Sequence, residues 1–133
     1  MKTVVILICC ATALLLTGCT GAKQTAGSYR QVTQTEAAAM MESESDYVIL
    51  DVRTREEYSQ GHIPGAICIP NETIGTDELP ELPDKDQLIL VYCRSGNRSK
   101  QASEKLVKLG YTNIVEFGGI TTWPGPTVSG SEE

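Results

Sequence analysis

The sequence predicts an α/β domain in which helices flank a mainly parallel central sheet, over about residues 31–128. Short apolar runs, typical of strands that are covered on both faces, alternate with segments that carry helix-capping signals. The chain has 133 residues, of which 41% are hydrophobic and 21% are charged. This composition suffices for one ordinary core and argues against disorder along the whole length.

The first helix is expected to begin after Thr33. Thr33 and Glu36 have the spacing of a capping box, and Ala37, Met40 and Met41 follow on one helical face. The two methionines therefore predict core packing.

A short buried strand over residues 47–50 should follow this helix. Thr54 and Glu57 have the capping-box spacing again, and Gly61 is placed to end a second, short helix. Residues 66–69 predict the next strand.

The second half of the domain predicts strands over residues 88–92 and 113–117. Between them, Ala102, Leu106 and Leu109 lie on one face of a helix that Gly110 would end.

The charge balance excludes one class of partner. The chain has 11 Lys and Arg against 17 Asp and Glu, a formal charge of -6, and it has no basic stretch. Nucleic acid is therefore not an expected partner, because phosphate binding needs clustered basic side chains.

The N-terminus predicts export. Lys2 precedes a run over residues 4–16 that is apolar except for Thr12 and too short for a stable membrane span. Its end, Leu16-Thr17-Gly18-Cys19, is similar to a bacterial lipobox. We expect residues 1–18 to be a lipoprotein signal peptide, Cys19 to carry the lipid, residues 19–30 to be a flexible tether and residues 129–133 a tail. The alternative is a buried N-terminal helix.

Processing at this motif would place the protein in the cell envelope. It would sit on the outer side of the cytoplasmic membrane or in the periplasm, held to the membrane only through the lipid. Cys9 and Cys10 would leave with the signal, so Cys68 and Cys93 would remain as free thiols. A disulfide between these two thiols stays open. Two cysteines with one histidine make a poor metal set.

The segment after residue 92 predicts a reactive thiol. Cys93 ends a strand, and a helix follows after a short polar loop. A helix start presents unpaired N–H groups and the positive end of the macrodipole, which lowers the pKa of a nearby thiol. The alternative is an inert buried cysteine. It is disfavoured because such a residue does not need the hydrogen-bond donors that this loop provides. The candidate anion-binding residues are Arg94, Ser95, Gly96, Asn97, Arg98 and Ser99.

Four segments together resemble a single-domain rhodanese, a sulfurtransferase family. They are the loop Cys93 to Ser99, Asp51-Val52-Arg53, His62-Ile63-Pro64-Gly65-Ala66 and Gly118-Gly119-Ile120-Thr121-Thr122-Trp123. The resemblance implies a three-layer domain in which Cys93 takes a sulfane sulfur from a small anionic donor such as thiosulfate. A thiol, including a protein thiol, or cyanide would accept the sulfur. It implies no metal and no organic cofactor.

The other polar residues of these segments are interpreted as structural support. Asp51 and Arg53 leave a strand on the same face, and with Glu57 they are expected to form an ion-pair and capping cluster. His62 is expected to hydrogen-bond within a turn.

Two alternatives to a sulfurtransferase remain. One is a non-catalytic persulfide carrier or docking module at the envelope. The other is a phosphatase-like enzyme, which is disfavoured because related phosphatases have an arginine six positions after the cysteine, where this chain has Ser99. In this chain Arg98 lies five positions after Cys93.

Overall fold

A computed structural model describes residues 27–131. The predicted signal peptide, Cys19 and most of the tether lie outside the described residues. The described part contains one sheet of five parallel strands in the order β1-β5-β4-β2-β3. The strands are β1 (Arg30–Gln31), β2 (Tyr47–Asp51), β3 (Ile67–Cys68), β4 (Leu88–Cys93) and β5 (Ile114–Gly119).

The helices begin where the capping signals predict. Capping boxes are present at Thr33 with Glu36 and at Thr54 with Glu57, and Gly61 follows the second helix. The α-helices are α1 (Gln34–Ser43), α2 (Arg55–Gln60) and α3 (Asn97–Lys108), and two 3₁₀ turns are η1 (Asn71–Thr73) and η2 (Ile120–Thr122).

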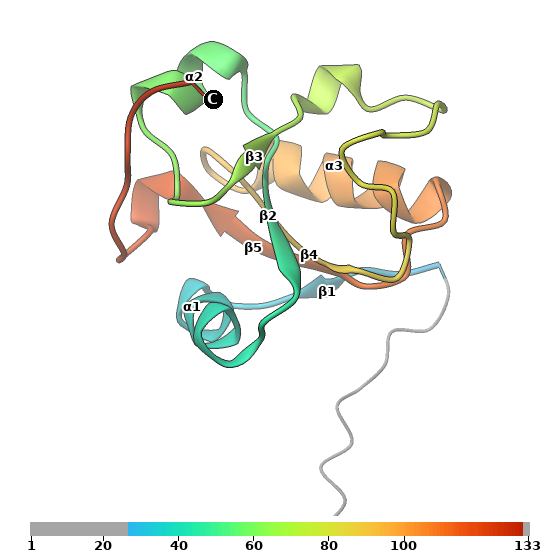
Figure 1. Cartoon of the computed structure of the whole chain (residues 1–133), viewed down its shortest axis with the longest axis horizontal. Coiled ribbons are helices and arrows are strands. Elements are labelled where there is room, and N and C mark those ends of the chain that lie inside the picture. The colour runs from blue at the N-terminus through green and yellow to red at the C-terminus, as the bar shows by residue number, and fades with distance from the viewer. Residues whose placement is uncertain (1–26, 132–133) are drawn as a thin grey trace, which may run out of the picture.

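The sheet separates two apolar clusters. Alternate residues of β4 enter opposite clusters: Val91 and Cys93 pack with Leu106 of α3, whereas Leu90 packs with Ala37 of α1. Figure 1 shows α1 and α3 on opposite sides of the strands. The predicted α/β fold, with a mainly parallel sheet flanked by helices, is therefore confirmed.

The edge strand β1 is an element that the sequence analysis does not predict. Its two residues pair with β5, Arg30 opposite Val115 and Gln31 opposite Glu116, and the N–H of Val32 donates to the carbonyl of Glu116 at 3.0 Å. Arg30 and Gln31 are polar and carry no strand signal, so the pairing is set by β5. The ordered domain therefore includes Arg30.

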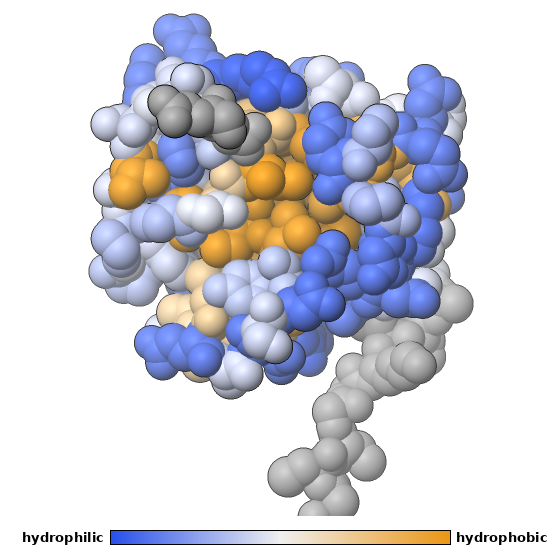
Figure 2. Space-filling model, viewed as in Figure 1, coloured by the Kyte–Doolittle hydropathy of each residue, from blue (hydrophilic) through white to orange (hydrophobic). Residues whose placement is uncertain are grey.

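One face of the molecule carries an apolar area within a hydrophilic rim, as Figure 2 shows. Among residues 27–131, Val128 is the one large apolar side chain that is well exposed, at 46%. The apolar area is therefore formed mainly by partly buried side chains. No helix in the described range has the length and apolar character needed to cross a membrane.

Candidate active site

Cys93 lies at the carboxyl end of β4, where the chain turns into α3. Its side chain is on the α3 face of the sheet, and the residue is 1% exposed. Gly96, directly before α3, has φ +104°, which a residue with a Cβ rarely adopts. This conformation curls the loop back, so that the N–H of Gly96 donates to the Sγ of Cys93 at 3.0 Å.

The loop favours the ionised form of Cys93. Burial by itself raises the pKa of the thiol. The hydroxyl of Ser99 and the backbone N–H groups of Ser99, Gly96 and Ser95 lower it, and together they outweigh burial, so the pKa lies below its ordinary value. The sulfur therefore lies among donors that stabilise an anion.

The other loop residues face outward. Arg94, Ser95 and Asn97 are exposed, and the carbonyl of Arg94 accepts hydrogen bonds from the N–H and hydroxyl of Thr121 at 3.2 and 3.1 Å. Beside the loop is a recess of about 500 Å³. It is lined by Arg53, Glu57, Gln60, Gly61, Arg94, Ile120, Thr121 and Thr127.

Gly119 at the end of β5 allows the loop to lie directly on the sheet. Gly119 is the register partner of Cys93. A Cβ at this position would overlap the carbonyl of Arg94 and the N–H of Ser95, both of them backbone groups that cannot rotate away. The close approach of the two segments thus requires glycine.

Arg98 forms a two-point ion pair with Glu57 of α2. The distances are 2.7 Å from Nη1 to Oε2 and 2.9 Å from Nη2 to Oε1. The hydrogen bonds from Arg98 are the main cause that lowers the pKa of Glu57 to about 2. Because this pKa is lowered, the pair adds stability above about pH 4.5 and loses it as the pH falls toward 2.

This ion pair corrects one expectation about the support cluster. The partner of the Glu57 carboxylate is Arg98, and not Arg53. The capping part of the prediction is confirmed, because Glu57 also accepts the backbone N–H of Thr54 at 3.0 Å. A role for Arg98 in binding the donor stays a prediction.

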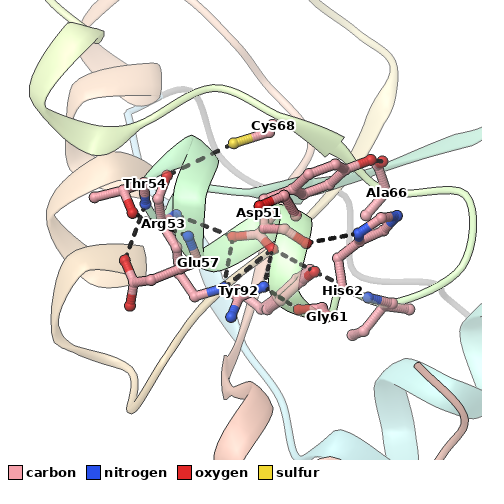
Figure 3. A network of polar contacts seen from close by, with 12 residues as sticks. Asp51, Arg53, Thr54, Glu57, Gly61, His62, Ala66, Cys68 and Tyr92 are labelled. Carbon is pink, nitrogen blue, oxygen red and sulfur yellow. Dashed lines mark hydrogen bonds and ion pairs between the residues drawn. The ribbon is translucent and has the colours of Figure 1, made fainter. Parts of the chain in front are cut away.

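Asp51 and Arg53 form a buried ion pair under α2, shown in Figure 3. The Nη2 of Arg53 lies 2.7 Å from Oδ2 of Asp51 and donates to the carbonyl of Gly61 at the same distance. The hydroxyl of Tyr92 donates to Oδ2 of Asp51 at 2.6 Å. Burial first, and then the Asp51 charge, raise the pKa of Tyr92, so it stays a neutral donor.

His62 has the contacts of a structural residue. Its Nδ1 donates to the carbonyl of Tyr58 at 2.8 Å, and its ring stacks on the Tyr58 ring with centroids 3.6 Å apart. The backbones of His62 and Val128 exchange hydrogen bonds of 2.8 and 2.9 Å, which closes the C-terminal segment onto the domain. Figure 3 shows the imidazole beside the Asp51 network.

The structure separates the two thiols. Cys68 packs in the cluster with Tyr58, on the face of the sheet opposite Cys93, and its Sγ donates to the carbonyl of Arg53 at 3.6 Å. Strand β2 lies between β3 and β4, which puts the two cysteines about 10 Å apart across the sheet. This is beyond the reach of a disulfide, so Cys68 and Cys93 are not joined to each other.

Glu116 is a site residue that the sequence analysis missed. It is 3% exposed, and its Oε1 accepts the Ser99 hydroxyl at 2.6 Å and the N–H of Gly118 at 2.9 Å. An acidic residue inside an otherwise apolar strand was the available signal. Within residues 27–131, no group of three His, Cys, Asp or Glu side chains is arranged to hold a metal ion.

Comparisons with known proteins agree with this geometry. The family model of the rhodanese-like domain matches residues 33–124. The chain is 40% identical to the thiosulfate sulfurtransferase PspE of Escherichia coli over 61% of this chain and 78% of that protein. It is also 40% identical to a sulfurtransferase of Allochromatium vinosum, over 59% of this chain and 72% of the relative.

Solved structures show the same likeness. A rhodanese from E. coli is 38% identical, with a TM-score of 0.58 over 63% of this chain and 99% of that one. The rhodanese-like domain of an Anabaena protein is 31% identical, with a TM-score of 0.68 over 77% of this chain and 80% of that one. With a cysteine loop of this geometry and a family match over most of its described residues, the chain belongs to the rhodanese-like domain family.

Proposed function

We propose that the protein is a sulfurtransferase that moves a sulfane sulfur from an anionic donor such as thiosulfate to a thiol or cyanide acceptor. The observation that carries this proposal is the Sγ of Cys93, which faces backbone N–H donors that lower its pKa. The names of the relatives, thiosulfate sulfurtransferase and sulfurtransferase, support the same reaction class.

The reaction needs two displacements at one sulfur. The Cys93 thiolate attacks the outer sulfur of thiosulfate, a new S–S bond forms, and sulfite leaves with the electron pair of the old one. The N–H groups that face the thiolate would then face the persulfide charge. Attack by an acceptor thiolate or cyanide on the outer sulfur restores the Cys93 thiolate. Arg94, exposed beside the recess, is placed to attract the anionic donor.

The test is the intact mass of a fragment that begins at Thr20, before and after incubation with thiosulfate. We expect a gain of one sulfur atom, removed again by cyanide or by a small thiol. Repeated turnover with these acceptors supports an enzyme, whereas loading without turnover identifies a persulfide carrier or docking module. No gain from thiosulfate or polysulfide would overturn sulfur transfer, and hydrolysis of phosphate esters would then be assayed.

We also propose that the protein is anchored in the cell envelope through a lipid on Cys19. The apolar run over residues 4–16 and the segment Leu16-Thr17-Gly18-Cys19 support this proposal. In a bacterial host, the full chain is expected in the membrane fraction with the mass of an acylated mature form. Cys19→Ser should lack the mass of the acyl chains. Unacylated full chain in the soluble fraction would contradict the anchor.

A further inference from the structure

Three buried side chains form a line beneath the active-site loop. They are Cys93, Ser99 and Glu116, which are 1%, 0% and 3% exposed. The Sγ of Cys93 lies 3.5 Å from the Oγ of Ser99, and that Oγ lies 2.6 Å from Oε1 of Glu116. The hydroxyl thus connects the thiol to a buried carboxyl group.

The hydroxyl of Ser99 has a single proton and several acceptors around it. The carbonyl oxygens of Gly96 and Gly118 lie 3.0 and 3.4 Å away, both farther than the carboxylate of Glu116. A distance of 2.6 Å is in the range of a charge-assisted O–H···O bond. When the hydroxyl donates to Glu116, it presents a lone pair to the thiol, which is then able to donate its proton along this line.

The charged groups around Cys93, Ser99 and Glu116 favour a state in which the thiol proton stays within these three residues. Arg98 of α3 interacts electrostatically with Cys93 and with Glu72 of η1, but its guanidinium is held by Glu57 of α2. Arg94 is exposed. From α1, the uncharged side chain of Gln34 reaches the carbonyl of Gly119. Loss of the thiol proton to solvent would leave two negative charges in this buried line, whereas an internal transfer leaves one.

We propose that Glu116 receives the thiol proton of Cys93 through the hydroxyl of Ser99, so that the two acidic groups share one proton. In this step the S–H bond breaks and a new O–H bond forms on Ser99. At the same time the original Ser99 O–H bond breaks and an O–H bond forms on Oε1 of Glu116. The Ser99 hydroxyl then donates to the thiolate, and the total charge is unchanged.

The two members of this relay act differently. Ser99 contacts the reacting sulfur, while Glu116 acts only through Ser99 and is a positioning residue. The N–H of Gly118 fixes Oε1 at 2.9 Å, so the carboxyl group cannot rotate away from Ser99 without losing a bond. The relay concerns the same Cys93 as the proposed function. Its test uses alkylation, which needs no sulfur donor, so the two ideas fail independently.

The first readout is the rate at which iodoacetamide alkylates Cys93, followed across pH by peptide mass. Two groups that share a proton titrate in two steps, so the wild-type profile should show two. Glu116→Gln keeps an oxygen for Ser99 and Gly118 but cannot take the proton. The Glu116→Gln profile should show one step, with a midpoint between the two wild-type midpoints. Ser99→Ala should lose the lower step.

Ser103→Ala is the matched control. Ser103 is also a buried serine of α3, and its hydroxyl donates to the carbonyl of Ser99 at 2.8 Å. The control should keep both steps. A single step in the wild type, or an unchanged two-step profile in Glu116→Gln, would overturn the relay.

The second readout uses infrared spectroscopy on the folded wild type, which guards against a variant that does not fold. Between the two steps, a protonated buried carboxyl group should be visible, and it should be absent in Glu116→Gln. It should also disappear in Cys93→Ser, which has no thiol proton to transfer. A band that persists in Cys93→Ser, or no such band in the wild type, contradicts proton sharing.

Discussion

Cys93→Ser is expected to abolish sulfur uptake from thiosulfate. Serine fits the same space, but its hydroxyl does not ionise at neutral pH, and no covalent persulfide can form on oxygen in this scheme. We expect a loss of at least about a thousandfold in loading and in turnover, the scale on which enzymes depend on a covalent nucleophile. The measurement is intact mass together with sulfite release.

Cys68→Ser is the matched control for this prediction. Cys68 is the other cysteine of the described domain and is also buried, at 3% exposure, but it lies on the opposite face of the sheet. Each folded molecule of this variant should still gain one sulfur atom. Sulfur uptake by Cys93→Ser, or a dependence of loading on Cys68, would reject Cys93 as the persulfide site.

Asp51→Ala is expected to produce the largest loss of stability. It leaves the guanidinium of Arg53 without its carboxylate partner in a site where Arg53 is 5% exposed. It also removes the acceptor of the Tyr92 hydroxyl and of the backbone N–H of Arg53. Removal of one partner of a buried ion pair costs about 3–5 kcal/mol, which is a large share of the stability of a small domain.

Chemical denaturation at neutral pH measures this loss. Glu78→Ala is the control, because the Glu78 carboxylate pairs with Lys85 at 2.9 Å but is 84% exposed. That variant should stay within about 0.5 kcal/mol of the wild type. A cost of less than about 1 kcal/mol for Asp51→Ala would show that the Asp51 network is not a stabilising support of the site.

Local signals in the sequence were enough to predict most of the fold. The capping boxes at Thr33 and Thr54 depend on contacts three residues apart, so their sequence spacing defines them. The strand, cysteine loop and helix around Cys93 are likewise one continuous segment. The edge strand β1 was not predictable, because its two polar residues become a strand only by pairing with β5, more than eighty residues later in the chain.

The parts of the site that escaped prediction depend on long-range register. The Arg98–Glu57 pair joins α3 to α2 across 41 residues of sequence, whereas the sequence offered Arg53 as a nearer cation for Glu57. Glu116 lies under the loop because β5 pairs with β4 in one particular register, which no local pattern sets. Sequence reasoning therefore located the candidate nucleophile Cys93 and its loop, but not the groups beneath them.

The direction of the parallel strands gives the domain an orientation relative to whatever holds its N-terminus. Gly27 and Tyr29 line a recess with Val107 and Lys108, at the C-terminal end of α3, whereas Cys93 lies at the N-terminal end of this helix. Twelve helical residues separate the two ends by about 18 Å. A domain tethered from residue 27 would turn Cys93 away from its point of attachment. On a membrane, the active-site loop and the recess beside it would lie on the side of the domain away from the anchor.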